Sequence, residues 1–326
     1  MAAPIALPPV DPALARTLQR FAQLDAATPA PQLSYAQRRR LLSELQARLV
    51  RTPLQGIAQH SFFVPAAGRE ICVRSYQKSS GKTQHTLVWL HGGGWMVGDL
   101  NTHDDLCERL ALCTGHCVLS VHYRRTPENP FPAPLDDVLA VLQWLRDMQG
   151  LQPLPQGKVL LGGDSAGAHL ALAAAIRQLQ GLPGDAGAAQ IDGLLLLYPP
   201  LLPGQDTESM RSFASGYGLT PAAMQLYWQA LGRVQGKAAA WIHPSRCETE
   251  IAQLPPTLVV TASHDILRDE GEAFALQAQA LGAPVQLQRA PGMVHGFARL
   301  VAASPAARQQ VESACTAWAE LLRTAA

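Results

Sequence analysis

The chain has 326 residues, of which 48% are hydrophobic and 16% charged, and its formal net charge is +1. This length and composition allow one large α/β domain with a sizeable core. The short basic cluster Arg38–Arg40 lies within an amphipathic stretch. Because a nucleic-acid groove needs clustered Lys and Arg, we expect no nucleic-acid partner.

The first residues, MAAPIALPPVDP, lack the basic region and the long apolar segment of a signal peptide. No apolar run is long enough to cross a membrane, so we expect no membrane span. The six cysteines are scattered and form no C-x-x-C pair, which is typical of free thiols in a reducing compartment. These features together predict a cytoplasmic protein.

Two amphipathic helices are predicted within residues 1–55. Asp11 and Pro12 form a helix start, and Ser34 with Gln37 can form a capping box before the second helix. Both helices precede the first strand. The sequence leaves open whether they form a lid or join the core.

From residue 61 the pattern changes to that of strands, and two of them flanking residues 66–68 predict a hairpin. Short apolar runs then alternate with helical stretches; these runs are 86–90, 117–123, 158–162, 194–198, 257–262 and 285–289. Runs that are apolar throughout and separated by helices predict a parallel sheet covered on both faces. The segment 203–235 is longer than a simple crossover needs and can supply a pocket wall, although its Met224, Tyr227 and Trp228 are interpreted as packing residues.

The glycine-rich stretch HGGGW (91–95) directly follows the strand run 86–90. Successive glycines leave backbone N–H groups unobstructed, so they can donate to an oxyanion. A phosphate cradle is the alternative, but no Lys-Ser/Thr pair follows and the spacing is not G-x-G-x-x-G. We expect His91 to brace this loop and Trp95 to line the acyl or alcohol pocket, with a core position as the alternative for Trp95.

The stretch GDSAG (163–167) lies between an apolar strand run and a helical segment. This is the context of a nucleophile elbow, a sharp strand-to-helix turn that exposes a serine. Glycines at 163 and 167 avoid clashes in such a turn, and the following helix N-terminus favours negative charge. Ser165 is therefore a candidate nucleophile, with an ordinary turn serine as the alternative.

A serine hydroxyl needs a base, and the base needs an acid that orients it. His295 follows the final strand run and is flanked by glycine-containing loop sequence, so it is the favoured base; the competing histidines are His264, His243 and His169. Asp265 follows the strand run 257–262 and is the favoured acid; the competing acids are Asp269 and Glu270. The order serine, acid, histidine along the chain is the one expected for an elbow triad.

Five motifs occur in order: HGGGW (91–95), YRRTPENPFPAPLDD (123–137), GDSAG (163–167), DILRDEGEAF (265–274) and GMVHGF (292–297). Together they resemble the hormone-sensitive lipase family of α/β-hydrolases, close to its bacterial carboxylesterases. The resemblance implies a central, mostly parallel sheet with helices on both faces in a core of residues 56–326. It also implies a helical cap formed by residues 1–55 with part of 203–235.

The same resemblance implies the site residues: Ser165 as nucleophile, Asp265 as acid, His295 as base, and the backbone N–H groups of Gly93, Gly94 and Ala166 as oxyanion donors. It implies a serine carboxylesterase that hydrolyses short to medium acyl esters through an acyl-enzyme, with no metal or organic cofactor. An amidase or a deacetylase would use the same triad. A non-catalytic small-molecule receptor is the competing class, and the presence of His295 argues against it. Family analogy also suggests a homodimer.

The sequence departs from the family pattern at several positions. His122 stands where the family usually has Asp, Ala168-His169 where it has Gly-Asn, and Ile266 where it has Pro. None of these departures removes a member of the expected triad. We expect them to affect local packing and substrate preference rather than the chemistry.

Overall fold

The computed structural model describes residues 7–27, 33–49, 54–81, 83–148, 154–182, 187–232, 236 and 238–324. The expected cap segments 1–55 and 203–235 therefore lie partly outside the described residues.

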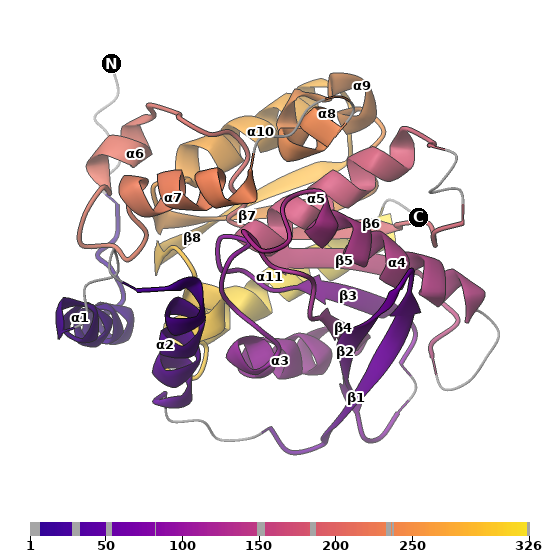
Figure 1. Cartoon of the computed structure of the whole chain (residues 1–326), viewed down its shortest axis with the longest axis horizontal. Coiled ribbons are helices and arrows are strands. Elements are labelled where there is room, and N and C mark those ends of the chain that lie inside the picture. The colour runs from indigo at the N-terminus through magenta and orange to yellow at the C-terminus, as the bar shows by residue number, and fades with distance from the viewer. Residues whose placement is uncertain are drawn as a thin grey trace.

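An 8-stranded sheet forms the centre of the molecule, with the strand order β1-β2-β4-β3-β5-β6-β7-β8 (Figure 1). The strands are β1 (Ile57–Ala66), β2 (Arg69–Lys78), β3 (Thr86–Leu90), β4 (Cys117–Val121), β5 (Val159–Asp164), β6 (Gly193–Leu197), β7 (Thr257–His264) and β8 (Val285–Val294). β2 pairs antiparallel with β1 and β4, and all other neighbours pair in parallel. The predicted hairpin and the predicted mostly parallel sheet are both confirmed.

The helices surround this sheet. They are α1 (Pro12–Ala27), α2 (Tyr35–Ala47), α3 (Asp104–Thr114), α4 (Ala133–Asp147), α5 (Ala166–Leu179), α6 (Glu208–Ser212), α7 (Pro221–Leu231), α8 (Ala238–Ile242), α9 (Glu248–Ile251), α10 (Arg268–Ala280) and α11 (Pro305–Thr324), with the 3-10 helices η2 (Asn101–His103), η3 (Pro244–Arg246) and η4 (Phe297–Leu300). In the described ranges, no helix has both the length and the apolar character needed to cross a bilayer.

Local sequence signals set the starts of the outer helices. Ser34 Oγ accepts from the Gln37 N–H at 3.3 Å, and Gln37 Oε1 accepts from the Ser34 N–H at 2.8 Å, which confirms the capping box of α2. Asp11 Oδ1 accepts from the N–H groups of the first turn of α1. Each cap pairs backbone donors that a helix start would otherwise leave free.

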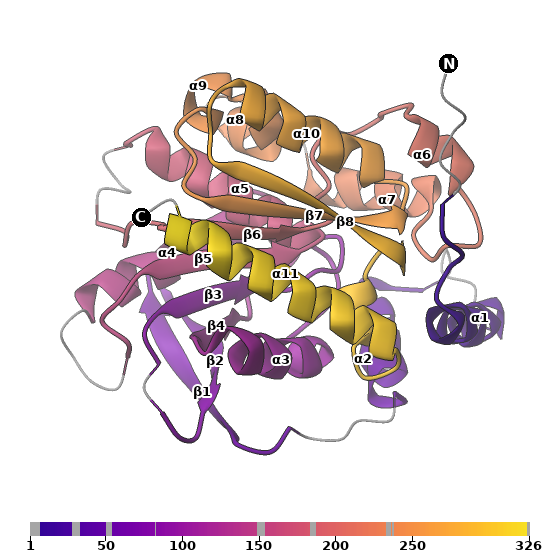
Figure 2. The same cartoon turned by 180° about the vertical axis from the view of Figure 1, so that it is seen from behind.

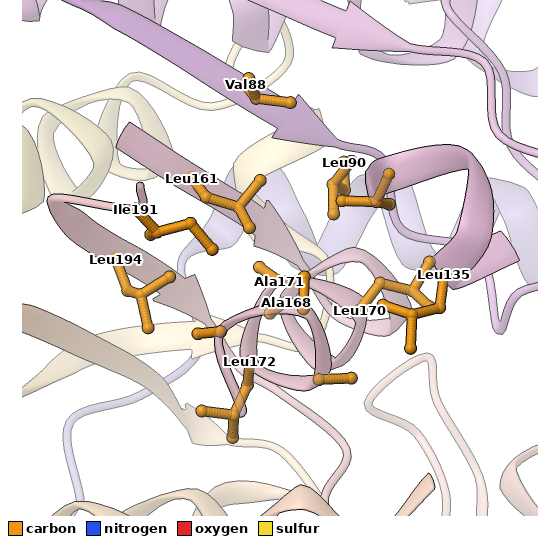
Figure 3. Close-up of a cluster of buried hydrophobic side chains, with 14 of the residues drawn as sticks. Val88, Leu90, Leu135, Leu161, Ala168, Leu170, Ala171, Leu172, Ile191 and Leu194 are labelled. Atoms are coloured by element: carbon orange, nitrogen blue, oxygen red, sulfur yellow. The ribbon is translucent and has the colours of Figure 1, made fainter. Parts of the chain in front are cut away.

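The alternation of side chains along β3 divides the interior into two cores. Leu87 and Trp89 face the side covered by α3 and α11, while Val88 and Leu90 face the side covered by α4, α5 and α10 (Figures 1 and 2). Figure 3 shows the second core, where Val88, Leu90, Leu161 and Leu194 lie opposite Leu135, Ala168, Leu170, Ala171 and Leu172. Each large aliphatic side chain buried this way stabilises the fold by about 1.5–3 kcal/mol. A sheet buried on both faces holds the loops at its strand ends in fixed positions.

Candidate active site

Ser165 lies in the sharp turn between β5 and α5. Its backbone has φ 51° and ψ −121°, a strained conformation for a residue with a side chain, and its N–H donates to the Leu197 carbonyl at 2.8 Å. A Cβ atom at Gly163 would overlap the backbone of Gly167, and one at Gly167 would overlap the Leu90 carbonyl. The turn therefore requires the two glycines that the sequence places there.

His295 lies between Ser165 and Asp265. Its Nε2 is 2.9 Å from Ser165 Oγ and its Nδ1 is 2.7 Å from Asp265 Oδ2. Asp265 is 1% exposed, and its Oδ1 accepts from the Leu267 N–H at 3.0 Å. With Nδ1–H donating to this fixed carboxylate, Nε2 is left as the acceptor for the Ser165 hydroxyl. The structure thus brings together the three residues that the sequence singled out as nucleophile, base and acid.

The competing residues are occupied elsewhere. Asp269 accepts from the Ser209 N–H and pairs with Arg268, while Glu270 accepts from the Leu201 N–H. His264 is bonded to the Ser263 hydroxyl through Nδ1 and stacks on the ring of Tyr217; His243 packs against Trp228. No hydrogen bond joins any of these side chains to Ser165 or His295 in the described part of the chain.

The loop after β3 lines the same cavity as Ser165 and His295. Gly93 and Gly94 have φ 122° and 57°, and their N–H groups have no hydrogen-bond partner among the described residues. A Cβ at Gly93 would overlap the Val97 carbonyl, and one at Gly94 would overlap the ring of Tyr227. Ala166 is the first residue of α5, so its N–H has no partner within the helix. All three backbone donors are therefore free for a ligand oxygen.

Beneath this loop lies a buried polar cluster that the sequence did not reveal. Asp164 Oδ1 accepts from the Gly92 N–H at 3.1 Å and lies 3.2 Å from His103 Nε2. Burial raises the pKa of Asp164, but His103, His91 and the Gly92 N–H together lower it by more, so the pKa of this carboxyl lies below its ordinary value. His103 follows no strand and belongs to no recognised motif, so only the three-dimensional structure identifies it as part of the loop's support.

His91 also braces the loop, as expected. Its ring stacks on Tyr123 with centroids 4.2 Å apart, its Nδ1–H donates to the Gly92 carbonyl, and the Tyr123 hydroxyl donates to the His91 carbonyl. Burial and the nearby His103 lower the pKa of His91 to about 3, so its ring is neutral at physiological pH. A neutral, enclosed ring of this kind supports the loop and takes no part in proton transfer.

The expectation that Trp95 lines the pocket is wrong. Trp95 is 0% exposed, and its indole N–H donates to His169 Nδ1 at 3.2 Å. His169 Nε2–H in turn donates to the Ile242 carbonyl at 3.1 Å, and burial lowers the pKa of His169 to about 4. The family departure at Ala168-His169 thus creates a neutral bridge from α5 to the end of the glycine loop and to α8.

A cavity of about 690 Å³ opens above Ser165. Apolar side chains of three helices line it: Leu18 and Phe21 from α1, Leu42 and Leu45 from α2, and Met224 from α7. These helices gather at one end of the molecule, on the left of Figure 1 and the right of Figure 2. Met224 and Tyr227, interpreted as packing residues, line this cavity as well. A neighbouring cavity of about 610 Å³ shares Met224, but neither Ser165 nor His295 lines it.

Within the described ranges, no group of three or more His, Cys, Asp and Glu side chains is arranged to hold a metal ion.

Known proteins share this architecture. A family model described as alpha/beta hydrolase fold matches residues 87–299. The chain is 34% identical over 241 residues to the carboxylic ester hydrolase LipN of Mycobacterium tuberculosis, a match that covers 73% of this chain and 63% of that protein, which is less than two thirds of its length. It is 31% identical over 248 residues to an acetyl-hydrolase of Streptomyces hygroscopicus, covering 74% of this chain and 78% of that protein.

Solved structures of esterases match this fold over nearly the whole chain. A thermostable esterase from Pseudomonas putida ECU1011 matches with a TM-score of 0.86 and 28% identity, covering 98% of this chain and 99% of that one. A hyperthermophilic esterase from the archeon Pyrobaculum calidifontis matches with a TM-score of 0.82 and 29% identity, covering 95% of this chain and 98% of that one. The fold and the resemblance expected from the five motifs are confirmed.

Proposed function

The chain belongs to the α/β-hydrolase family whose model matches residues 87–299, and on that basis we propose that it is a serine carboxylesterase acting on short to medium acyl esters. The observation that carries this proposal is His295, held by Asp265 at 2.7 Å and facing the Ser165 hydroxyl at 2.9 Å. The largely apolar cavity of about 690 Å³ above Ser165 supports an uncharged acyl chain of modest length as one part of the substrate.

In the proposed reaction, His295 Nε2 takes the Ser165 proton as Oγ attacks the ester carbonyl carbon. The carbonyl oxygen becomes an oxyanion and accepts from the N–H groups of Gly93, Gly94 and Ala166. When the tetrahedral intermediate collapses, the ester C–O bond breaks and the leaving alkoxide takes the proton from His295. Water then attacks the acyl-enzyme with His295 again as base, and the carboxylic acid leaves as Ser165 recovers its proton.

We also propose that α1, α2 and the segment around α7 act as a cap over this site. The support is that all three line the cavity that contains Ser165, and that the Tyr227 ring lies against Gly94 of the glycine loop. A cap of this kind excludes water from the reacting ester and limits the size of the acyl chain.

The test compares p-nitrophenyl esters of graded acyl length with a matched p-nitroanilide and an N-acetylated amine. We expect hydrolysis of the esters to fall by several orders of magnitude in Ser165→Ala and to stay unchanged in Ser80→Ala, whose serine is exposed and outside the site. A fluorophosphonate probe should label the wild type but not Ser165→Ala. Preferred cleavage of the amides would replace the esterase proposal, and no labelling with no turnover would favour a receptor.

Cytoplasmic location and dimerisation are further parts of this proposal. The six cysteines are free, which supports a reducing compartment, and β8 has no strand on its outer side among the described residues, which leaves an edge for a second copy. Cell fractionation and light scattering coupled to size-exclusion chromatography test the two statements separately.

A further inference from the structure

One guanidinium lines the cavity above Ser165. Arg299 lies in η4, four residues after His295, and its side chain contributes to the same wall as Leu300. Asp164 is the one carboxylate among the described lining residues, and it is already engaged by Gly92 and His103. Arg299 is therefore a positive charge facing a largely apolar cavity.

The contacts of Arg299 leave one edge of its guanidinium free. Nη1 donates to Gln46 Oε1 at 3.2 Å, Gln46 Nε2 donates back to the Arg299 carbonyl at 2.9 Å, and the guanidinium carbon lies 6.0 Å from the Phe21 ring centre. Nε and Nη2 have no hydrogen-bond partner in the described part of the chain, and neither belongs to the enclosed unpaired atoms. Nε and Nη2 form the side of a guanidinium that binds a carboxylate through two parallel hydrogen bonds.

The charge of Arg299 is only partly compensated, because the Asp164 carboxylate attracts it without forming an ion pair with it. None of the ion pairs among the described residues includes Arg299, whereas Arg124 pairs with Asp137 and the buried Arg268 pairs with Asp269. Burial lowers the pKa of Arg299, but a guanidinium stays charged at physiological pH. A largely buried positive charge without an ion-pair partner is unfavourable, and an anionic ligand in contact with it reduces that cost.

We propose that Arg299 binds a carboxylate on the substrate, so that this enzyme prefers esters bearing a carboxylate on the acyl or the alcohol part over neutral esters of equal length. The inference rests on the proposed ester hydrolysis and names a substrate class for it. Arg299 is then a specificity residue: its free Nε–Nη2 edge holds the carboxylate while the ester carbonyl lies at Ser165. A purely structural role, in which Arg299 only fixes Gln46 of α2, would affect neutral and anionic esters equally.

The test uses matched substrate pairs. The acyl arm compares mono-p-nitrophenyl glutarate with p-nitrophenyl pentanoate, and the alcohol arm compares butyryloxyacetate with ethyl butyrate. We expect the anionic member of one pair to have the higher kcat/KM, and Arg299→Met to lower the anionic-to-neutral ratio about 10- to 100-fold. Arg299→Lys keeps the positive charge but cannot form the two parallel hydrogen bonds. Its anionic-to-neutral ratio should therefore lie between those of the wild type and Arg299→Met.

Two further variants separate specificity from structure. Gln46→Leu breaks the contact with α2 but keeps the charge, so the ratio should not change. Arg323→Met removes an exposed arginine of α11 and serves as the control. An unchanged ratio in Arg299→Met would overturn the proposal.

A binding measurement distinguishes this inference from the proposed function. Ser165→Ala should bind the anionic ester of the preferred arm in calorimetry, monoethyl glutarate for the acyl arm or butyryloxyacetate for the alcohol arm, and the double variant with Arg299→Met should not. Binding without wild-type hydrolysis of any ester would contradict the esterase while supporting the carboxylate site. Hydrolysis of neutral esters with no such binding would contradict only the carboxylate site.

Discussion

Replacing Glu270 by Gln tests how burial has set the ionisation of a carboxyl beside the site. Glu270 is 7% exposed, its Oε1 accepts from the Leu201 N–H at 2.8 Å, and its Oε2 is buried with no partner. Burial, with a smaller contribution from the nearby Asp265 carboxylate, raises the pKa of Glu270 to about 8, although the hydrogen bond from Leu201 opposes this rise. Glu270 is therefore neutral at physiological pH, unlike the acid that orients His295.

The sign of the effect follows from proton uptake. Between pH 4.5 and about 8 the folded protein holds a proton on Glu270 that the unfolded chain has released. The free energy of unfolding therefore falls as pH rises through this window and levels off above it. At 1.36 kcal/mol per pH unit, the window corresponds to roughly 5 kcal/mol.

The Glu270→Gln variant keeps the carbonyl acceptor for Leu201 and cannot ionise. Its free energy of unfolding, relative to wild type, should rise from near zero at the acid end of the window to several kcal/mol at the alkaline end. Urea unfolding at three pH values, followed by tryptophan fluorescence, measures this difference. Glu320→Gln is the control, because Glu320 is exposed on α11. If the free energies of unfolding of the wild type and Glu270→Gln changed in parallel between pH 4.5 and about 8, the reasoning would be refuted.

Three further outcomes are expected. Gly94→Ala, whose Cβ would overlap the Tyr227 ring at φ 57°, should lower kcat about 10²- to 10³-fold without changing the circular dichroism spectrum. Asp164→Asn should lower the free energy of unfolding by about 1.5–3 kcal/mol at neutral pH. Because the pKa of Asp164 in the folded protein lies below 3.8, the wild-type carboxylate becomes protonated only below that pH, and the difference between the two proteins should vanish there. His169→Phe should cost about 1–3 kcal/mol in thermal unfolding, since the buried Trp95 N–H loses its acceptor; an unchanged melting temperature would contradict the bridge.

The strands could be predicted because burial on both faces leaves a continuous apolar signal. The run 86–90 coincides with β3, where every residue is buried. The last two strands extend beyond their predicted ends, β7 to His264 and β8 to Val294. Their final pairing, His264 opposite Val294, follows an irregularity in register between Ala262 and His264. A hydrophobic pattern does not specify where the register between two strands changes.

The elbow and the glycine loop were predictable for a related reason. Their requirement for glycine is local, because a Cβ at Gly167 or Gly93 would overlap backbone that is close in the fold. Which side chains then meet across these loops is a tertiary property. Arg299 follows His295 by four residues and belongs to none of the chemical motifs in the sequence. In the structure it lines the cavity and donates to Gln46 of α2, which is 253 positions away in the chain.

One hydrogen bond explains both the family departure at His169 and the wrong prediction for Trp95, because it joins these two residues in the core. At φ 58° the backbone of Trp95 is in the left-handed region, and its side chain lies in the core. A buried indole N–H needs an acceptor, and the neutral His169 supplies one while donating to Ile242. His169 is therefore better understood as the partner of Trp95 than as an isolated substitution in the helix after Ser165. Because the two residues are 74 positions apart in the chain, neither motif alone predicts the other.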